Sequence, residues 1–184
     1  MGMKVAFIVA EGTELTECIA TMDVLRRAGI EIHTFGREYT ITHSVNTDYK
    51  IYSPDYYSAI VFPGGGLGVK NVKEEVLKNK VFRDNILKTK EDGKLVAAIC
   101  AAPSILGEIG LLKGKRYTCY PGFSSYSFGG EHTGSTVEVD GQLITARSMY
   151  YSVDFGLAIL ENLMGKEKRI EIEEQVKGLK PKNR

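Results

Sequence analysis

The feature that most constrains the fold is a run of apolar residues, Leu95–Ile99, in which apolar and polar side chains do not alternate. A strand of this kind is typical of the centre of a parallel sheet that is covered on both faces. Similar short runs at residues 4–10, 30–35 and 59–62 are separated by longer stretches with helical spacing. This order of strand and helix predicts a doubly wound α/β fold, with a mostly parallel sheet sandwiched by helices.

The same periodicity predicts the remaining elements. We expect helices over residues 14–28, 72–90, 103–109, 152–163 and 166–176. We expect strands over residues 116–120, 135–139 and 142–146, and a small hairpin whose arms, 39–43 and 49–52, flank a turn at Asn46, Thr47 and Asp48. Gly29 stands where a glycine commonly ends a helix, so the first helix should stop there.

Length and charge limit what kind of protein this is. The chain has 184 residues, which suits a single domain over residues 1–184, with 177–184 as a flexible basic tail. The formal net charge of +1 argues against a nucleic-acid partner or a membrane-surface partner. The first apolar run is far shorter than the roughly 20 residues that span a bilayer, so we expect no membrane partner. Three cysteines are too few, and odd in number, for a disulfide framework, which suggests a cytoplasmic protein.

Cys100 is the most informative residue of the chain. It ends the central apolar run and is followed by Ala101, Ala102 and Pro103. Ligands of a doubly wound sheet bind beyond the carboxyl ends of its strands, and small neighbours permit the sharp turn that exposes a nucleophile there. The amides at the start of the next helix should stabilise a thiolate and lower the pKa of Cys100. The alternative is a small buried cysteine, and the local sequence alone does not decide between the two.

Two further features fall at the same edge of the predicted sheet. The segment 63–68, Pro-Gly-Gly-Gly-Leu-Gly, could present an oxyanion hole of backbone amides beside Cys100, or could be a tight turn into the next helix. Glu14 shares a face of the first helix with Cys18, and Glu17 with Thr21, so the two acids should differ in environment. An acid turned toward the sheet should have a raised pKa and could donate or shuttle a proton to the sulfur. The alternative role for such acids is to complement the helix dipole.

In combination and order, these segments resemble the ThiJ/PfpI superfamily, which includes the human parkinsonism-associated deglycase and bacterial intracellular proteases and chaperones. The resemblance covers about residues 4–168. The matching segments are 14–17 (Glu-Leu-Thr-Glu), 23–30, 63–68 and 97–103 (Ala-Ala-Ile-Cys-Ala-Ala-Pro), with support from 139–141 and 155–158. The resemblance implies a flavodoxin-like fold and a homodimer, and we expect neither a cofactor nor a metal.

The resemblance also implies roles for individual residues. Cys100 would be the nucleophile at the strand-to-helix elbow, and Glu17 the protonated partner of its sulfur. Gly65 and Ala101 would supply the backbone amides that bind the oxyanion. We expect the pocket to be lined by Gly64, Glu14 and Tyr150.

Two segments depart from the family pattern. Many members place a histidine near the cysteine, just after a Gly-Gly pair, but here Glu131 follows that pair and His132 comes next. Either residue could occupy the family position, and a surface loop is the alternative for His132. Relatives usually line the pocket with Gly-Pro-Gly where this chain has Ser-Met-Tyr-Tyr at 148–151, which should narrow or reshape the pocket. Tyr150 and Tyr151 could instead form a dimer interface.

Three functions compete on this evidence. The first is glyoxalase-like or deglycase-like chemistry on a small carbonyl substrate, in which Cys100 attacks an aldehyde and Glu17 moves a proton. The second is a redox sensor or stress chaperone that works through oxidation of Cys100 to a sulfinate. The third is an intracellular cysteine peptidase or amidase, which needs a base such as His132 to activate the thiol. An amidotransferase-like glutaminase ranks last, because the chain lacks a later His-x-Glu pair.

Overall fold

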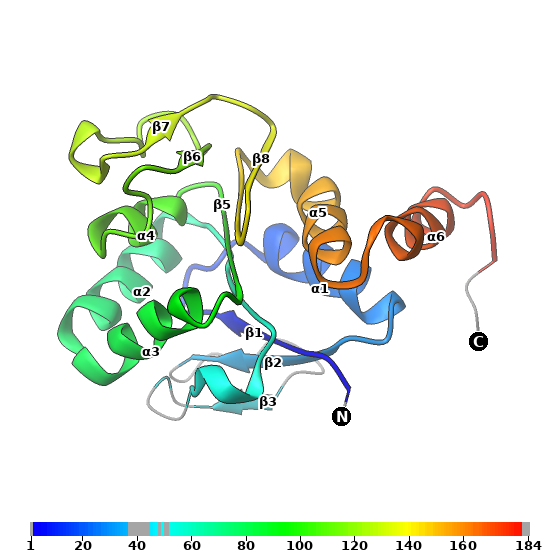
Figure 1. Ribbon diagram of the computed structural model, residues 1–184, viewed down its shortest axis with the longest axis horizontal. Coiled ribbons are helices and arrows are strands. Elements are labelled where there is room, and N and C mark those ends of the chain that lie inside the picture. Colours follow the sequence, from blue (N-terminus) through cyan, green and yellow to red (C-terminus); the bar gives the residue numbers. More distant parts are fainter. Residues whose placement is uncertain (1, 37–44, 48, 50–51, 182–184) are drawn as a thin grey trace.

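The computed structural model describes residues 2–36, 45–47, 49 and 52–181, and within them a seven-stranded sheet forms the centre of the molecule (Figure 1). Its strands lie in the order β3-β2-β1-β4-β5-β9-β8. Their bounds are β1 Lys4–Ile8, β2 Glu31–Phe35, β3 Val45–Thr47, β4 Ala59–Phe62, β5 Leu95–Ile99, β8 Val137–Asp140 and β9 Leu143–Ala146. All neighbours pair in parallel except β8 and β9, which are antiparallel. The predicted α/β class with a mostly parallel sheet is confirmed.

Helices cover both faces of this sheet. Figure 1 shows α2 (Gly66–Lys78), α3 (Lys80–Glu91) and α4 (Pro103–Glu108) on one side, and α1 (Leu15–Arg27), α5 (Ser152–Met164) and α6 (Lys166–Val176) on the other. A smaller parallel pair, β6 (Arg116–Tyr117) and β7 (Glu131–His132), lies beyond the main sheet. Three short 3-10 turns complete the described elements, at Pro54–Tyr56, Tyr126–Phe128 and Met149–Tyr151.

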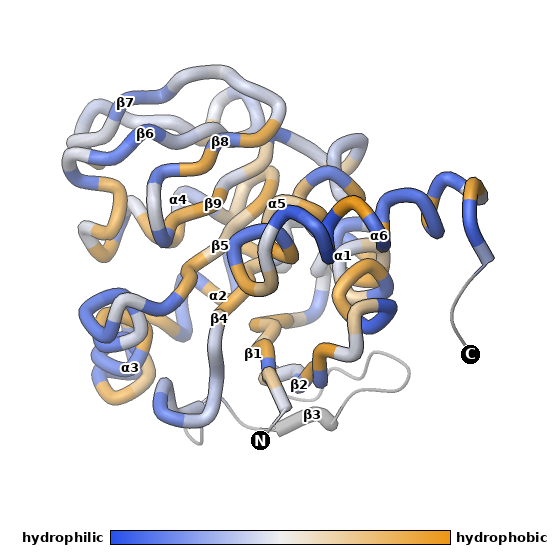
Figure 2. Tube along the Cα trace, turned by 45° about the vertical axis from the view of Figure 1, so that its right-hand side comes forward, coloured by the Kyte–Doolittle hydropathy of each residue, from blue (hydrophilic) through white to orange (hydrophobic). Residues whose placement is uncertain are grey.

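Successive side chains of the central strands feed two separate cores. In β5, Val96 and Ala98 belong to the core under α2, α3 and α4, whereas Leu95, Ala97 and Ile99 belong to the core under α1 and α5. Because both faces of β5 are buried, its sequence shows no polar alternation. The tube in Figure 2 shows the same strands as the apolar centre of the molecule.

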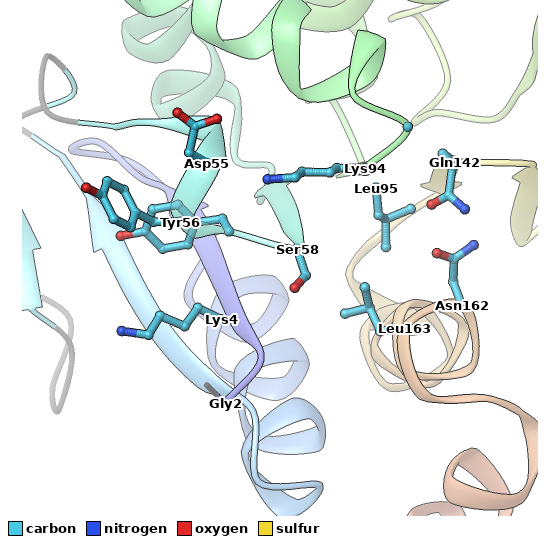
Figure 3. Close-up of a pocket in the computed structure, with 12 residues that line it drawn as sticks. Gly2, Lys4, Asp55, Tyr56, Ser58, Lys94, Leu95, Gln142, Asn162 and Leu163 are labelled. Atoms are coloured by element: carbon cyan, nitrogen blue, oxygen red, sulfur yellow. The ribbon is translucent and has the colours of Figure 1, made fainter.

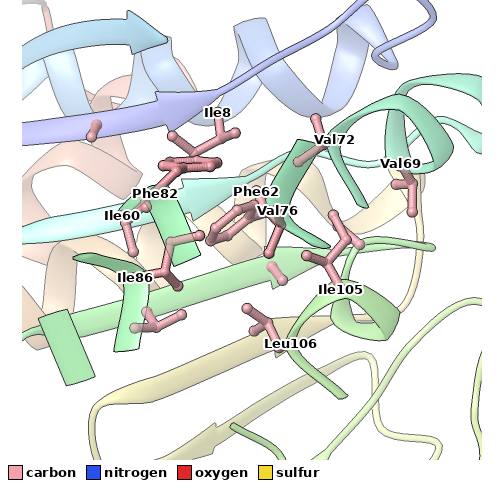
Figure 4. Packing of buried hydrophobic residues seen from close by; sticks show 14 of the residues in the cluster. Ile8, Ile60, Phe62, Val69, Val72, Val76, Phe82, Ile86, Ile105 and Leu106 are labelled. Carbon is pink, nitrogen blue, oxygen red and sulfur yellow. The ribbon is translucent and has the colours of Figure 1, made fainter. Parts of the chain in front are cut away.

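The core under α2 and α3 is packed by large side chains. Figure 4 shows Phe82 and Ile86 of α3 against Ile60 and Phe62 of β4, and all four are fully buried. Burying one such side chain stabilises the fold by about 1.5–3 kcal/mol. This packing fixes the β4 and β5 ends that carry the candidate site.

Several predicted elements have different bounds in the structure. The single helix expected over 72–90 is two helices, because Asn79 is extended (φ −96°, ψ 95°) and its side chain accepts a hydrogen bond from the amide of Phe82. Asparagine favours such capping positions over helix interiors. The strand expected over 116–120 ends at Tyr117, and the one expected over 135–139 runs over Val137–Asp140.

The predicted turn of the hairpin is wrong. Asn46 and Thr47 belong to β3, which pairs in parallel with β2 so that Asn46 lies opposite Thr34. Pairing with a buried strand outweighs the turn preference of these residues at the sheet edge. One expected arm, 39–43, lies outside the described residues, as do residues 50 and 51 of the other.

Candidate active site

Cys100 occupies the turn directly after β5. Its φ is +64°, the one positive value at a non-glycine position among the described residues. The turn is held on both sides, because the Cys100 amide donates to the Ala146 carbonyl of β9 (2.9 Å) and the Cys100 carbonyl accepts from the Tyr120 amide (2.8 Å). A non-glycine residue in this region carries backbone strain, which surrounding structure must maintain and which is concentrated at functional sites. The sharp elbow predicted at Cys100 is therefore confirmed.

Glu17 lies in the first turn of α1 and is turned toward the sheet. Its side chain is 1% exposed, and its Oε2 accepts a hydrogen bond from the Gly64 amide at 2.7 Å. No described residue hydrogen-bonds to the buried Oε1. Burial raises the pKa of Glu17 to about 7, against the lowering effect of its hydrogen bonds with Cys100 and the Gly64 amide. The carboxyl group therefore changes protonation near neutral pH, as required of a group that both takes and returns a proton.

The pKa of the Cys100 thiol differs from the sequence prediction. Burial raises it to about 12, and the charge of Glu17 and a hydrogen bond with Glu17 add to that rise. Hydrogen bonds from the amides of Ala101 and Gly65 lower it, but by less. The expected lowering is wrong because burial of the sulfur and the neighbouring acid outweigh the effect of these amides. Glu17 and Cys100 thus form one coupled pair, which loses its first proton near pH 7.

The glycine segment permits the acid and the thiol to approach each other. A Cβ atom on Gly64 would lie 2.3 Å from Glu17 Oε2 and 2.6 Å from Cys100 Cβ. Gly65 has a φ of +96°, and a Cβ there would lie 2.3 Å from the Gly12 carbonyl oxygen. The Gly64 carbonyl also accepts from the Glu14 amide (3.0 Å), which ties the start of α1 to this segment.

The sulfur faces a cavity of about 460 Å³. The predicted residues that line it are Glu14, Glu17, Gly65, Cys100, Ala101 and Tyr150. Gly64 contacts Glu17 and Cys100 but does not itself line the cavity. Tyr150 stands at the mouth with 85% of its surface exposed, and its ring contacts that of Tyr151 edge-on.

Five further residues line the cavity: Gly66, Tyr120, Phe123, Ser148 and Met149. The segment 148–151 was expected to reshape the pocket, but Tyr120 and Phe123 were not identified from the sequence. They come from the loop after β6, which has no periodic pattern. The one available signal was the turn sequence Tyr-Pro-Gly-Phe at 120–123, which follows a predicted strand at the same sheet edge.

His132 lies elsewhere. It is exposed in β7, its ring packs against Tyr117 with centroids 5.5 Å apart, and it lines a separate cavity of about 410 Å³ together with Glu131. Among the described residues, the cavity at Cys100 contains neither His132 nor Glu131. Among the described residues the structure therefore brings no histidine to the sulfur, and the position of His132 does not fit the catalytic role expected of it.

A larger cavity, of about 570 Å³, opens at the opposite end of the sheet (Figure 3). It lies where the strands begin, between Lys4, Ser58, Lys94 and Gln142. Its described lining residues include no cysteine and no glutamate. Cys100 and Glu17 instead line the cavity at the carboxyl edge of the sheet, where doubly wound folds bind ligands.

Comparison with known proteins agrees with this geometry. Residues 3–162 match the model of the DJ-1/PfpI family. The chain belongs to the DJ-1/PfpI family. It is 35% identical over 192 residues to dj-1beta of Drosophila melanogaster, which covers 97% of each chain. The crystal structure of Drosophila DJ-1beta superposes with a TM-score of 0.80 at 33% identity, covering 97% of this chain and 98% of that one.

Two other relatives differ from these in length or in the activity that their names give. DJ-1 homolog B of Arabidopsis thaliana is 35% identical over 180 residues, which cover 92% of this chain but only 40% of that protein. A deglycase of Pyrococcus horikoshii is 33% identical over 154 residues, covering 79% of this chain and 90% of that one.

The described part of the chain holds no helix that is long and apolar enough to cross a membrane. Nor do its described histidine, cysteine, aspartate and glutamate side chains gather in threes at a place that could hold a metal ion.

Proposed function

We propose that this DJ-1/PfpI family member converts small reactive carbonyls by glyoxalase-like or deglycase-like chemistry, with Cys100 as nucleophile and Glu17 as proton donor and acceptor. The observation that carries the proposal is the buried carboxyl group of Glu17, which has a pKa of about 7. It lies beside Cys100, whose backbone is strained, and both residues line one cavity. The Pyrococcus relative is named a deglycase, which supports the same class of reaction.

The first step forms a bond between Cys100 Sγ and the aldehyde carbon of a 2-oxoaldehyde. As the bond forms, the thiol proton passes to the Glu17 carboxylate, so the attack does not require a free thiolate. The aldehyde oxygen gains negative charge and then takes that proton from Glu17, which gives a hemithioacetal and restores the Glu17 carboxylate. The amides of Gly65 and Ala101 lie beside the sulfur and are placed to donate hydrogen bonds to that oxygen.

The second step is an internal oxidation and reduction. Glu17 removes the proton from the carbon bonded to sulfur and delivers a proton to the neighbouring ketone carbon. The hydroxyl proton on the first carbon moves to the former ketone oxygen, so the first carbon becomes a thioester carbonyl and the second a secondary alcohol. Water then cleaves the thioester, which releases a 2-hydroxy acid and restores the thiol. Overall, one dicarbonyl and one water give one 2-hydroxy acid, and no external oxidant or reductant is consumed.

The direct test is methylglyoxal turnover by variants of the pair. Cys100→Ala should lower kcat/KM by at least about a thousandfold, and Glu17→Gln by about 10²–10⁴-fold, because each removes a group that acts in the transition state. Cys119→Ala is the matched control for loss of a thiol, since Cys119 is 1% exposed and outside the cavity. Turnover by Cys100→Ala at the wild-type rate would disprove the proposal.

A redox-sensing role for the same thiol is the second candidate, and one observation favours it. Cys100 is half-buried, whereas Cys18 and Cys119 are fully buried. Two equivalents of peroxide would therefore oxidise Cys100 to the sulfinate, with release of two waters, before the other thiols react. Mass spectrometry after mild peroxide should place the modification at Cys100 alone. Equal oxidation of all three cysteines would contradict it.

A peptidase has less support, because no described histidine lies in the cavity.

We also propose that the protein is a homodimer. Leu15 and Ile19 lie one turn apart on α1 and are 52% and 45% exposed, and Met149 and Tyr150 are exposed at the nearby cavity mouth. Exposed apolar and tyrosine side chains in one area are typical of protein interfaces. Sedimentation should give twice the 20.3 kDa chain mass, and Ile19→Asp should shift the species toward the single-chain mass. A wild-type protein of single-chain mass at micromolar concentration would contradict this.

A further inference from the structure

The cavity at Cys100 does not end at its aromatic wall. A second cavity, of about 310 Å³, adjoins it, and both are lined by Gly66 and Phe123. Phe123 is half-buried, packs against the core, and has its ring centroid 6.4 Å from that of Tyr120. The side chain of Phe123 therefore stands at the boundary between the two hollows, with the sulfur on one side of it.

The second cavity follows one face of α2. Its lining residues include Gly66, Val69, Lys73 and Leu77, which are spaced three or four residues apart and so share a side of the helix. Gly66 belongs to the Cys100 cavity as well, so the stripe begins at the reactive site. At a rise of 1.5 Å per residue, the stripe extends about 16 Å from Gly66 to Leu77. We name this stripe, together with Phe123, the α2 groove.

The α2 groove has apolar residues along its length and charged residues at its exposed edge, where Lys70 and Glu74 also line the second cavity. Val69 is buried beneath it, and Leu77 remains 48% exposed at its far end. Lys73 crosses the groove toward α4, where its ammonium lies 3.7 Å from a carboxylate oxygen of Glu108. Because that charge has a partner, Lys73 offers the groove its aliphatic stem.

The two cavities together are much larger than a three-carbon dicarbonyl requires. We propose that the α2 groove is a specificity subsite that binds an extended apolar substituent of the carbonyl compound whose aldehyde reacts at Cys100. The inference rests on the proposed function and names its preferred substrate class: 2-oxoaldehydes with a long alkyl or aryl group rather than methylglyoxal. Burial of the substituent against Phe123, Val69 and Leu77 supplies the preference.

The test compares kcat/KM for 2-oxohexadecanal and methylglyoxal, in the wild type and in Leu77→Asp. The extended chain of 2-oxohexadecanal is long enough to follow the stripe from Gly66 to Leu77. Wild-type protein should favour 2-oxohexadecanal by about tenfold or more, since each apolar group held in a pocket adds a factor of this order. Leu77→Asp should lose most of that preference while its methylglyoxal value stays unchanged, because Leu77 lies far along α2 from the sulfur. Leu67→Asp is the matched control: Leu67 is on the same helix, is 53% exposed, and does not line either cavity.

The outcomes separate the two levels of the proposal. Equal kcat/KM for both aldehydes, or a preference that survives Leu77→Asp, overturns the α2 groove as a subsite and leaves the proposed function intact. A preference lost equally in Leu67→Asp and Leu77→Asp also overturns it, because the effect would then be one of added charge. Failure of the wild type to turn over either aldehyde overturns the proposed function itself.

Discussion

At the scale of single residues, the site depends on a carboxyl group and a thiol brought together in a partly buried position. Burial raises the pKa of both groups, and the charge of Glu17 raises that of Cys100 further, so the pair holds two protons below about pH 7 and one above it. Because the lone proton can reside on either atom, one state can present an attacking sulfur and a proton acceptor together. In the proposed mechanism Glu17 therefore has the role that a histidine base has in other thiol enzymes.

The closeness of the pair should make Gly64 intolerant of any side chain. In Gly64→Ala the new methyl group would meet Glu17 Oε2 and Cys100 Cβ at 2.3 and 2.6 Å. Relief of these contacts must displace one partner, so we expect a loss of about 1–3 kcal/mol in the free energy of unfolding, measured with urea. Gly66→Ala is the control, because nothing lies within 4 Å of its Cβ and the position is helical. If both variants were equally stable, the packing described at Gly64 would be wrong.

Burial of Glu17 should also make stability depend on pH. Its pKa rises from 4.5 to about 7 on folding. Below pH 4.5 the acid is protonated in both states, and as pH rises through 7 the unfolded state gains relative stability because it ionises first. Glu17→Gln cannot ionise, so its advantage over the wild type should grow by up to about 3 kcal/mol between pH 4 and pH 8. Urea unfolding at the two pH values measures this.

The matched control for that experiment is Glu14→Gln, at the neighbouring acid that is only half-buried. It should show a much smaller change between the two pH values. A Glu17→Gln variant whose difference from wild type is the same at pH 4 and pH 8 would contradict the raised pKa.

At the scale of elements, the break between α2 and α3 shows how one residue sets a boundary. Asn79 is extended, and its Oδ1 accepts from the Phe82 amide at 3.1 Å, which anchors the start of α3 and the buried Phe82 beneath it. Asn79→Ala should lower the free energy of unfolding by about 1 kcal/mol through loss of this cap. Asn79→Asp keeps an acceptor in place and should lose less. Equal losses in thermal or urea unfolding would show that the cap has no role.

Elements with both faces buried could be predicted from the sequence, and those with weak patterns could not. The strand Leu95–Ile99 and the helix before Gly29 have strong signals, because burial on both faces and a glycine stop leave few alternatives. Asn46 and Thr47 have no such signal, because their strand conformation depends on pairing with β2. The same applies to Tyr120 and Phe123, whose place at the cavity is fixed by a loop.

The chemistry of the site was predictable in part for a similar reason. Local pattern predicts the elbow at Cys100 and acids at the start of α1, whereas the choice of Glu17 as the partner of the sulfur rests on the family resemblance. The direction of the Cys100 pKa depends on the distance to Glu17 and on how much of the sulfur the cavity covers. Both are set by how α1 packs against the sheet, which no local pattern contains.

At the scale of the whole molecule, strand order explains why the site is where it is. The chain runs from β1 outward to β2 and β3, then returns to β4 and β5 on the other side of β1. Loops that follow β1 and β4 therefore diverge to opposite faces and leave a crevice between them, as at other switch points of doubly wound sheets. Glu17 comes after β1, the glycine segment after β4 and Cys100 after β5, so three separate chain segments meet at one crevice.

The central claim is that Cys100 and Glu17 react as one coupled pair, and the pH dependence of kcat/KM for methylglyoxal tests it most directly. In the wild type, kcat/KM should rise with a midpoint near pH 7, where the pair loses its first proton. In Glu17→Gln the remaining activity should be at least about a hundredfold lower and should show no midpoint near pH 7. A Glu17→Gln variant that keeps the same midpoint and rate would contradict the claim.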